Sequence, residues 1–206
     1  MLIARHRGFT IIELMIGVAL LAILMMLAFP TFTTMAQNAR LRGTAESILA
    51  GLQSARAEAL KRNQTAEFLL MAEVPDEDLF GGFGANTTGP HWAVRILDTA
   101  GVPVAFVEGR SALEGSGVSN TADLYARTSA ANLPAMGGAI RFDSLGRTNV
   151  GTVNATFDVQ PADPSQCRAN GGDRRCLRVV VTAGGRVRMC DPSINPVANP
   201  TDTRIC

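Results

Sequence analysis

The 206-residue sequence has few of the side chains that enzymes use in catalysis. It contains two histidines, His6 and His91, and no Gly-x-x-x-x-Gly-Lys pattern that would cradle a phosphate. A histidine-assisted nucleophile or a histidine-rich metal site is therefore hard to build. Ser111, Ser116 and Ser119 stand in a Gly/Ser-rich stretch with no obvious base nearby. The sequence thus predicts a protein that is not an enzyme and that uses no metal, cofactor or small-molecule substrate.

The chain also has little net charge and no internal repeat. A formal net charge of +1 excludes a globally basic nucleic-acid binder but leaves room for a local basic patch. The length leaves space for one soluble domain of about 140 residues beyond the N-terminal third.

Cysteine is absent before residue 167. The four cysteines are Cys167, Cys176, Cys190 and Cys206, and their spacings do not resemble pairs of zinc ligands. An even number clustered in an exported domain predicts two disulfides and an oxidising compartment such as the periplasm, with three connectivities open. We predict Cys167–Cys176 and Cys190–Cys206, because these local loops would brace the last hairpin and tie down the C-terminal tail.

An apolar run occupies the N-terminus. Between Phe9 and Phe29 the one charged residue is Glu13, and as a helix the run is about 31 Å long, enough to cross a bilayer core. Arg5 and Arg7 precede it, a basic flank that the positive-inside bias keeps in the cytoplasm. A secretory signal carries its small-residue cleavage site after the apolar core, whereas Gly8 lies before it. We therefore expect cleavage after Gly8 to remove the leader and keep the helix.

Glu13 needs a partner or a function, because a carboxylate inside an apolar span costs up to about 2.5–3.5 kcal/mol. It either reaches the headgroup layer or pairs with the amino terminus of Phe9 on a neighbouring subunit. The stretch Gly8-Phe9-Thr10-Ile11-Ile12-Glu13-Leu14 resembles the class III signal of type IV pilins and type II secretion pseudopilins. The resemblance implies cleavage between Gly8 and Phe9 by prepilin peptidase, N-methylation of Phe9, and assembly through Glu13.

The middle of the chain predicts an α+β fold. Apolar residues recur at helical spacing from Leu41 to Ala59, which extends the helix through Pro30 to about Arg62, with Asn63 as a stop. Strands are expected over 65–71, 92–97, 102–107, 139–142, 155–159, 177–182 and 186–190, with Pro103 near a sheet edge. One N-terminal helix followed by hairpins implies an antiparallel sheet packed on that helix.

Four segments follow from this pattern. They are a leader over 1–8, a transmembrane and assembly helix over 9–29, an amphipathic second half of the helix over 30–62, and a β-rich head over 63–206. The acidic stretch 73–84 is interpreted as a solvated loop, because its carboxylates do not have EF-hand spacing. The connection from Glu108 to Gly138 is the least predictable part.

Arginine is concentrated near the C-terminus. Between Cys167 and Cys190 there is a single acid, Asp173, and six arginines: Arg168, Arg174, Arg175, Arg178, Arg186 and Arg188. The planar guanidinium contacts phosphate bidentately and stacks on bases. Arg186 and Arg188 are two residues apart and project from one face of a strand. On spacing alone, a polar strand face turned to solvent is favoured over a DNA contact.

Two further stretches resemble the GspH/FimT family of minor pilins. Ile140 to Arg147 resembles the strand-turn signature near the middle of its domains. Gly185-Arg186-Val187-Arg188, followed by Cys190, is similar to the Gly-Arg-x-Arg motif of FimT proteins, which bind DNA during uptake by type IV pili in natural transformation. The resemblance implies a single-pass protein of the bacterial inner membrane, with a disulfide-tied head in the periplasm, that enters the pilus after assembly.

The resemblance also implies partners and site residues. The partners are other major and minor pilins, prepilin peptidase, the inner membrane and DNA, the last bound non-specifically by Arg186, Arg188, Arg178 and the adjoining Gly185. FimU-like minor pilins that prime pilus assembly have similar endings. Three functions therefore stay open: priming of assembly without DNA binding, DNA capture by an assembled pilin, and a minor pseudopilin of type II secretion.

The register of the last hairpin decides where its arginines point. A three-residue loop over 183–185 places four apolar side chains on one face, Val179, Val181, Val187 and Met189. The opposite face then collects Arg178, Val180, Thr182, Arg186 and Arg188. We predict this register because a two-residue loop would mix the two sets. It implies a solvent-facing arginine cluster whose DNA binding is insensitive to sequence and weakens with salt.

Overall fold

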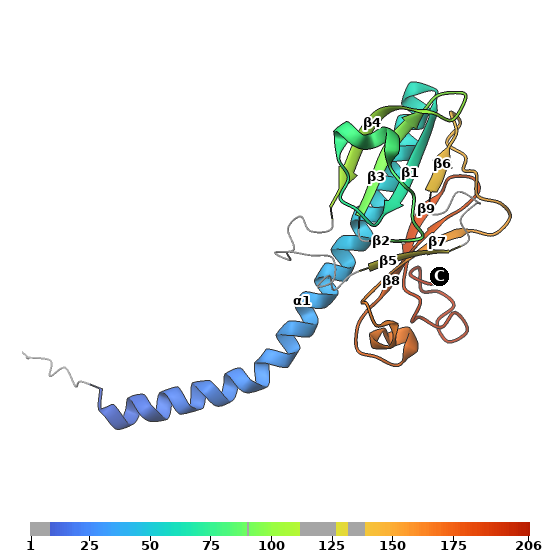
Figure 1. The fold of residues 1–206 in the computed structure, drawn as a ribbon. Coiled ribbons are helices and arrows are strands. Elements are labelled where there is room, and N and C mark those ends of the chain that lie inside the picture. Colours follow the sequence, from blue (N-terminus) through green and yellow to red (C-terminus); the bar gives the residue numbers. More distant parts are fainter. Residues whose placement is uncertain (1–8, 90, 112–126, 132–138) are drawn as a thin grey trace, which may run out of the picture. The chain divides into compact units, whose positions relative to one another are not determined.

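The protein is described here by a computed structural model. It covers residues 9–89, 91–111, 127–131 and 139–206, with the backbone alone for 27–31 and 127–130. The chain divides into two compact units, with the boundary after Ala36. Helix α1 (Ile11–Arg62) begins in the first unit and ends in the second (Figure 1).

Helix α1 begins with a reciprocal cap. The backbone N–H of Thr10 donates to the Glu13 carboxylate at 2.9 Å, and the N–H of Glu13 donates to Thr10 Oγ1 at 3.3 Å. This capping box satisfies two backbone donors at the helix start.

As predicted, the helix continues through Pro30. Among the described residues, no helix has a stretch that is both long and apolar enough to cross a membrane. The membrane span expected over 9–29 stays a prediction.

The second half of α1 is the apolar spine of the head. Its stripe of fully buried side chains repeats every three or four residues: Leu41, Ala45, Ile48, Leu52, Ala55 and Ala59. The helix ends at Arg62, and Asn63 takes the left-handed conformation, with φ of 53°. The predicted amphipathic helix and its stop are therefore confirmed.

The first sheet packs on this spine and has the strand order β4-β3-β1-β6. Its strands are β4 (Pro103–Arg110), β3 (His91–Leu97), β1 (Thr65–Met71) and β6 (Ala139–Phe142), all paired antiparallel. Pro103 lies in an edge strand, as predicted. Trp92 stacks on Phe68 at a centroid distance of 5.6 Å and donates from Nε1 to Ser47 Oγ at 2.9 Å. This contact ties α1 to the sheet.

A second sheet has the order β2-β5-β7-β8-β9. Its strands are β2 (Thr88–Gly89), β5 (Arg127–Ala131), β7 (Ala155–Gln160), β8 (Leu177–Val181) and β9 (Val187–Cys190). The α+β class is confirmed, but the strands form two antiparallel sheets where one was expected. The split arises because β6 pairs with β1, whereas β7 pairs with β5 and β8. Phe157 and Phe68 pack edge to face at 5.6 Å, so both sheets share one core.

The connections contain short 3-10 helices. The predicted acidic loop includes η1 (Glu77–Gly82), and the segment around Cys167 includes η3 (Pro164–Gln166) and η4 (Arg168–Asn170). Strand β5 was not expected, because its residues are small and polar. Parts of the long connection, 112–126 and 132–138, lie outside the described residues.

Both predicted disulfides are present, with Cα–Cα distances of 5.5 Å for Cys167–Cys176 and 5.1 Å for Cys190–Cys206.

Candidate nucleic-acid interface

The β8–β9 hairpin has the predicted register. Val181 lies opposite Val187 and Val179 opposite Met189. The N–H of Thr182 donates to the carbonyl of Arg186 at 3.0 Å, which leaves three residues, 183–185, in the loop. The apolar face packs on the core, and the arginines share the other face.

The hairpin loop is fixed to a distant turn of the chain. Thr148 donates from its backbone N–H to the carbonyl of Ala183 at 2.9 Å and from Oγ1 to the carbonyl of Thr182 at 3.0 Å. A Cβ added at Gly185 would lie 1.9 Å from the carbonyl oxygen of Gly146. The Ile140–Arg147 stretch and the Gly-Arg-x-Arg stretch, remote in sequence, therefore meet in space.

The turn that supports the loop is held by Asp143. Its Oδ1 accepts from the N–H groups of Leu145 and Arg147, each at 2.9 Å, and its Oδ2 accepts from Arg147 Nε at 3.0 Å. Burial alone would raise the pKa of Asp143, but these hydrogen bonds from Arg147 and Leu145 outweigh it and lower the pKa below its ordinary value. The turn that supports the hairpin loop is therefore held by side-chain as well as backbone hydrogen bonds.

The predicted solvent-facing cluster of three arginines is wrong for two of its members. Arg178 donates from Nε and Nη2 to the Asp158 carboxylate at 2.6 and 3.2 Å. Arg188 donates from Nη1 and Nη2 to the main-chain oxygens of Ile205 and Cys206 at 2.7 and 3.0 Å. Both side chains are half-buried, whereas Arg186 is exposed.

The reasons for the two engaged arginines differ. Asp158 lies directly opposite Arg178 on β7, so a cross-strand ion pair forms. Arg188 is covered because the Cys190–Cys206 disulfide returns the tail to β9. The pairing with Asp158 could have been found from the strand register. The predicted Cys190–Cys206 disulfide indicated that the tail returns to β9, but no sequence signal showed that its main-chain oxygens would reach Arg188.

Asp191 anchors the start of that tail. It is 3% exposed and accepts from Arg175 Nε at 2.7 Å and from Ser193 Oγ at 2.6 Å. Burial alone would raise the pKa of Asp191, but the hydrogen bonds from Ser193 and Arg175 outweigh burial and lower the pKa. The N–H of Asp191 also donates to the carbonyl of Arg204 at 2.7 Å. The tail is thus an ordered part of the head.

Charge on the arginine face is unevenly balanced. Asp158 compensates Arg178, but Arg188 binds main-chain oxygens, and Arg186 has no side-chain ion pair among the residues described. A guanidinium that has no ion pair can donate hydrogen bonds to the oxygens of a phosphate. Of the three arginines on this face, Arg186 is therefore the one most accessible to an anion.

Comparison with known proteins identifies the family. The sequence model of the prokaryotic N-terminal methylation motif matches residues 3–29, and that of the type II transport protein GspH matches residues 44–185. The chain belongs to the GspH family of minor pilins and pseudopilins. Members of this family are structural pilins and pseudopilins, so this protein is not an enzyme.

Three solved structures are similar to this chain. FimU, a type IV minor pilin of Pseudomonas aeruginosa, is 16% identical, with 75% of this chain and 90% of that chain covered and a TM-score of 0.48. The minor pseudopilin EpsH of Vibrio cholerae is 13% identical over 75% and 99%, with a TM-score of 0.44. GspH of E. coli is 12% identical over 75% and 90%, with a TM-score of 0.42. A search of curated proteins finds no match.

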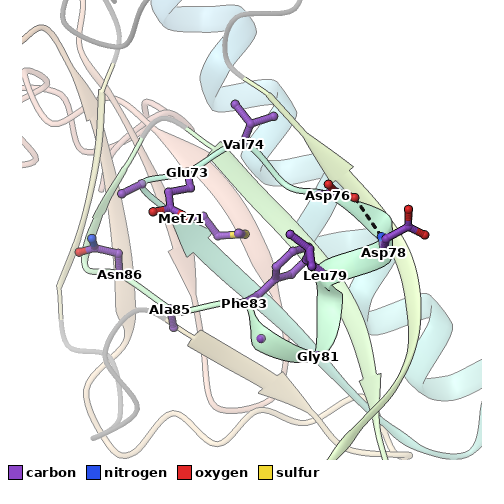
Figure 2. A pocket seen from close by; sticks show the side chains of 13 residues that line it. Met71, Glu73, Val74, Asp76, Asp78, Leu79, Gly81, Phe83, Ala85 and Asn86 are labelled. Carbon is purple, nitrogen blue, oxygen red and sulfur yellow. Dashed lines mark hydrogen bonds between the residues drawn. The ribbon is translucent and has the colours of Figure 1, made fainter.

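The protein has a second surface feature, an open groove beside η1. Figure 2 shows Met71, Phe83 and Ala85 among its lining residues, with Asp76 and Asp78 at η1. Arg95, paired with the buried Glu67 at 2.8 Å, donates to the carbonyl of Phe80 and holds η1 in place. Within the described part of the chain, no group of acidic or histidine side chains is placed to hold a metal ion. The groove residues bear carboxylates and no cation, so a polyanion does not fit there.

The predicted processing and assembly residues lie at the other end of the chain. Phe9 is 89% exposed, whereas Gly8 lies outside the described residues. The Glu13 carboxylate accepts from Thr10 of its own chain, through the backbone N–H and through Oγ1. Its pairing with Phe9 of a neighbouring subunit stays a prediction.

Proposed function

We propose that this protein is a minor type IV pilin that is incorporated into pili, supports their biogenesis and binds DNA non-specifically for uptake in natural transformation. The observation that carries the DNA-binding part is the exposed Arg186, in a hairpin whose loop is fixed to the 143–148 turn. A guanidinium on a rigid support binds phosphate with less loss of entropy than one on a mobile loop.

The hairpin residues have different roles in this proposal. Arg186 contacts a phosphate directly, and Gly185 gives the loop its shape. Arg188 adds charge next to it but already donates to the main-chain oxygens of Ile205 and Cys206, and Arg178, paired with Asp158, contributes least. Because phosphate contacts carry no sequence information, binding is expected to be insensitive to sequence and to weaken steeply as salt rises.

Processing and location complete the proposal. Prepilin peptidase cleaves between Gly8 and Phe9, Phe9 is N-methylated, and Glu13 contacts neighbouring major and minor pilins during assembly. The match to the methylation motif over residues 3–29 supports this order of events. The two disulfides fit a head that lies in the oxidising periplasm while the chain is held in the inner membrane before assembly. Mass spectrometry of the mature chain tests it: a chain that begins anywhere but Phe9 rules out this processing.

The DNA-binding part is tested with the full chain in detergent, which shields the exposed apolar residues of α1. Labelled duplex DNA is titrated at low salt into the parent, Arg186→Gln, and the control Arg42→Gln. Arg42 is an exposed helix arginine paired with Glu46. We expect Arg186→Gln to weaken binding and to reduce the salt slope by about 1, with no effect of Arg42→Gln. Equal binding by Arg186→Gln and the parent would refute the hairpin as the DNA site.

A second candidate is a minor pseudopilin of a type II secretion system. The observation in its favour is the matching family itself, described as a type II transport protein. Deletion of the gene separates the two: lost piliation and DNA uptake support the first proposal, whereas lost protein secretion with normal piliation supports the second. Lost piliation together with a chain that binds no DNA supports a role in assembly priming.

A further inference from the structure

The groove beside η1 is built by a single segment of the chain, residues 71–86. This segment leaves β1 and turns back to its end, where the N–H of Asn86 donates to the carbonyl of Leu70 at 2.8 Å. The groove has a volume of about 660 Å³, within the range of sites that hold ligands. It is therefore large enough to receive several side chains of a partner.

Contacts with the first sheet hold the groove in this shape. Arg95, itself paired with the buried Glu67, donates from Nη1 to the carbonyl of Phe80 at 2.8 Å and to that of Phe83 at 3.4 Å. The Phe83 ring packs edge to face on Phe106 of β4 at a centroid distance of 6.2 Å. A partner that binds a groove already held in shape loses less conformational entropy than one that must order a loop.

Apolar side chains line the groove. Figure 2 shows Met71, Leu79 and Phe83 among the lining residues. Met71 is buried and Phe83 half-buried, whereas Leu79 is 65% exposed and Val74, also in the lining, is 52% exposed. Exposed apolar side chains that adjoin a concave apolar surface are typical of protein interaction sites.

Carboxylates surround these apolar side chains. Glu73, Asp76 and Asp78 belong to the lining, and Glu77 is exposed in η1. Among the residues described, none of these four carboxylates forms an ion pair, whereas the buried Asp191 pairs with an arginine. Like charges held together repel, so a cation brought to the groove would be attracted and would relieve the repulsion.

We propose that the groove docks a segment of another protein in which an apolar side chain is flanked by arginine or lysine. The apolar side chain packs against Met71, Leu79 and Phe83, and the flanking cations lie beside Asp76 and Asp78. Apolar burial supplies affinity, and the charges supply orientation and specificity. Phosphates would be repelled, so the groove and the arginine hairpin take different partners. The inference goes beyond the proposed function and does not depend on DNA binding.

The test uses the full chain in a nonionic detergent and three labelled peptides of equal length. The first has leucine flanked by arginines, and the other two have glutamine or glutamate in place of each arginine. Fluorescence anisotropy measures binding at low and at high salt. We expect the arginine peptide to bind most tightly and to weaken as salt rises, because its charges are screened. The glutamine peptide should bind more weakly, and the glutamate peptide not at all.

Variants of the groove show whether the peptide binds there. Asp76→Asn keeps the cap of η1, where Asp76 Oδ1 accepts from the N–H of Asp78, and removes only the charge. It should weaken binding of the arginine peptide about 2- to 5-fold. Leu79→Ala should weaken binding of both the arginine and the glutamine peptide about 5-fold. Asp173→Asn, which removes an exposed carboxylate outside the groove, is the control and should bind like the parent.

The outcomes each decide the proposal. The docking groove is overturned if the parent binds no arginine peptide at low salt, or if Asp76→Asn and Leu79→Ala bind it like the control. Equal affinity for the arginine and glutamine peptides would overturn the basic partner. Self-association of the parent in sedimentation, lost in Leu79→Ala, would assign the groove to a second copy of this chain instead. Because both substituted residues are exposed, unchanged melting curves are expected for the variants.

Discussion

At the scale of single residues, Gly185 meets two requirements at once. Its backbone has a φ of 76°, in the left-handed region, and its Cα lies against the Gly146 carbonyl, where a side chain has no room. Gly184 next to it has open space and no such conformation. The glycine of the Gly-Arg-x-Arg stretch is thus a structural residue that sets the place of Arg186.

Gly185→Ala is therefore expected to lower the free energy of unfolding by about 2 kcal/mol or more, from backbone strain and the clash with Gly146. Gly184→Ala is the matched control and should change stability little. Urea unfolding of the two oxidised variants and the parent measures this. Equal midpoints for the two variants would contradict the docking of the loop on the turn.

Arg188 holds the C-terminal tail by two hydrogen bonds to main-chain oxygens. Arg188→Gln should cost about 1.5–3 kcal/mol and make residues 191–206 more sensitive to limited proteolysis, because these bonds are lost. The control Arg186→Gln should leave proteolysis unchanged. A tail that is cut at the same rate in both variants would show that Arg188 does not hold it.

At the scale of elements, the tail depends on a buried carboxylate. Hydrogen bonds from Ser193 and Arg175 lower the pKa of Asp191 in the folded state below its unfolded value of about 3.9. A carboxyl with a lowered pKa stabilises the fold above its unfolded pKa, and this contribution is lost as the pH falls through the folded pKa. The tail is therefore expected to loosen in acid, below about pH 4.

Asp191→Asn tests this pH dependence. It should lower stability at pH 7, and it should lose less stability than the parent when the pH is taken from 7 to 2.5. Urea unfolding at the two pH values provides the measurement. Glu77→Gln, at an exposed position in η1, is the control for removing one carboxylate. If Asp191→Asn and the parent lose the same stability in acid, Asp191 is not the group responsible.

At the scale of the whole molecule, Glu13 links helix formation to assembly. In the isolated chain its carboxylate caps the helix through Thr10, whereas the proposed function needs its charge for a neighbouring subunit. These two roles can be separated, because glutamine still forms a capping box but has no charge. Valine provides neither.

We expect Glu13→Gln and Glu13→Val both to reduce incorporation of the chain into pili, since both remove the charge. Immunoblots of sheared pili, compared with the cell-bound pool, measure incorporation. Glu46→Gln, a change of the same kind farther along α1, should assemble normally. Normal assembly of Glu13→Gln with failure of Glu13→Val would mean that Glu13 acts as a helix cap and not as a charge.

Local sequence patterns determined much of this protein. The helix stripe from Leu41 to Ala59, the stop at Asn63, the three-residue hairpin loop and both disulfides followed from periodicity, turn chemistry and short loops. Each depends on residues close together in the chain, where spacing alone fixes which side chains share a face. The family resemblance rested on equally local motifs.

Only the tertiary structure decided which arginines are available. Sequence places Arg178, Arg186 and Arg188 on one strand face, but Asp158 comes from β7 and the tail comes from beyond Cys190 to engage two of them. The support under Arg186 is equally remote in sequence, because Gly146 and Thr148 of the central turn contact the hairpin loop. The same is true of the division into two sheets. Such contacts depend on the path of the chain between distant segments, which no spacing within a segment can specify.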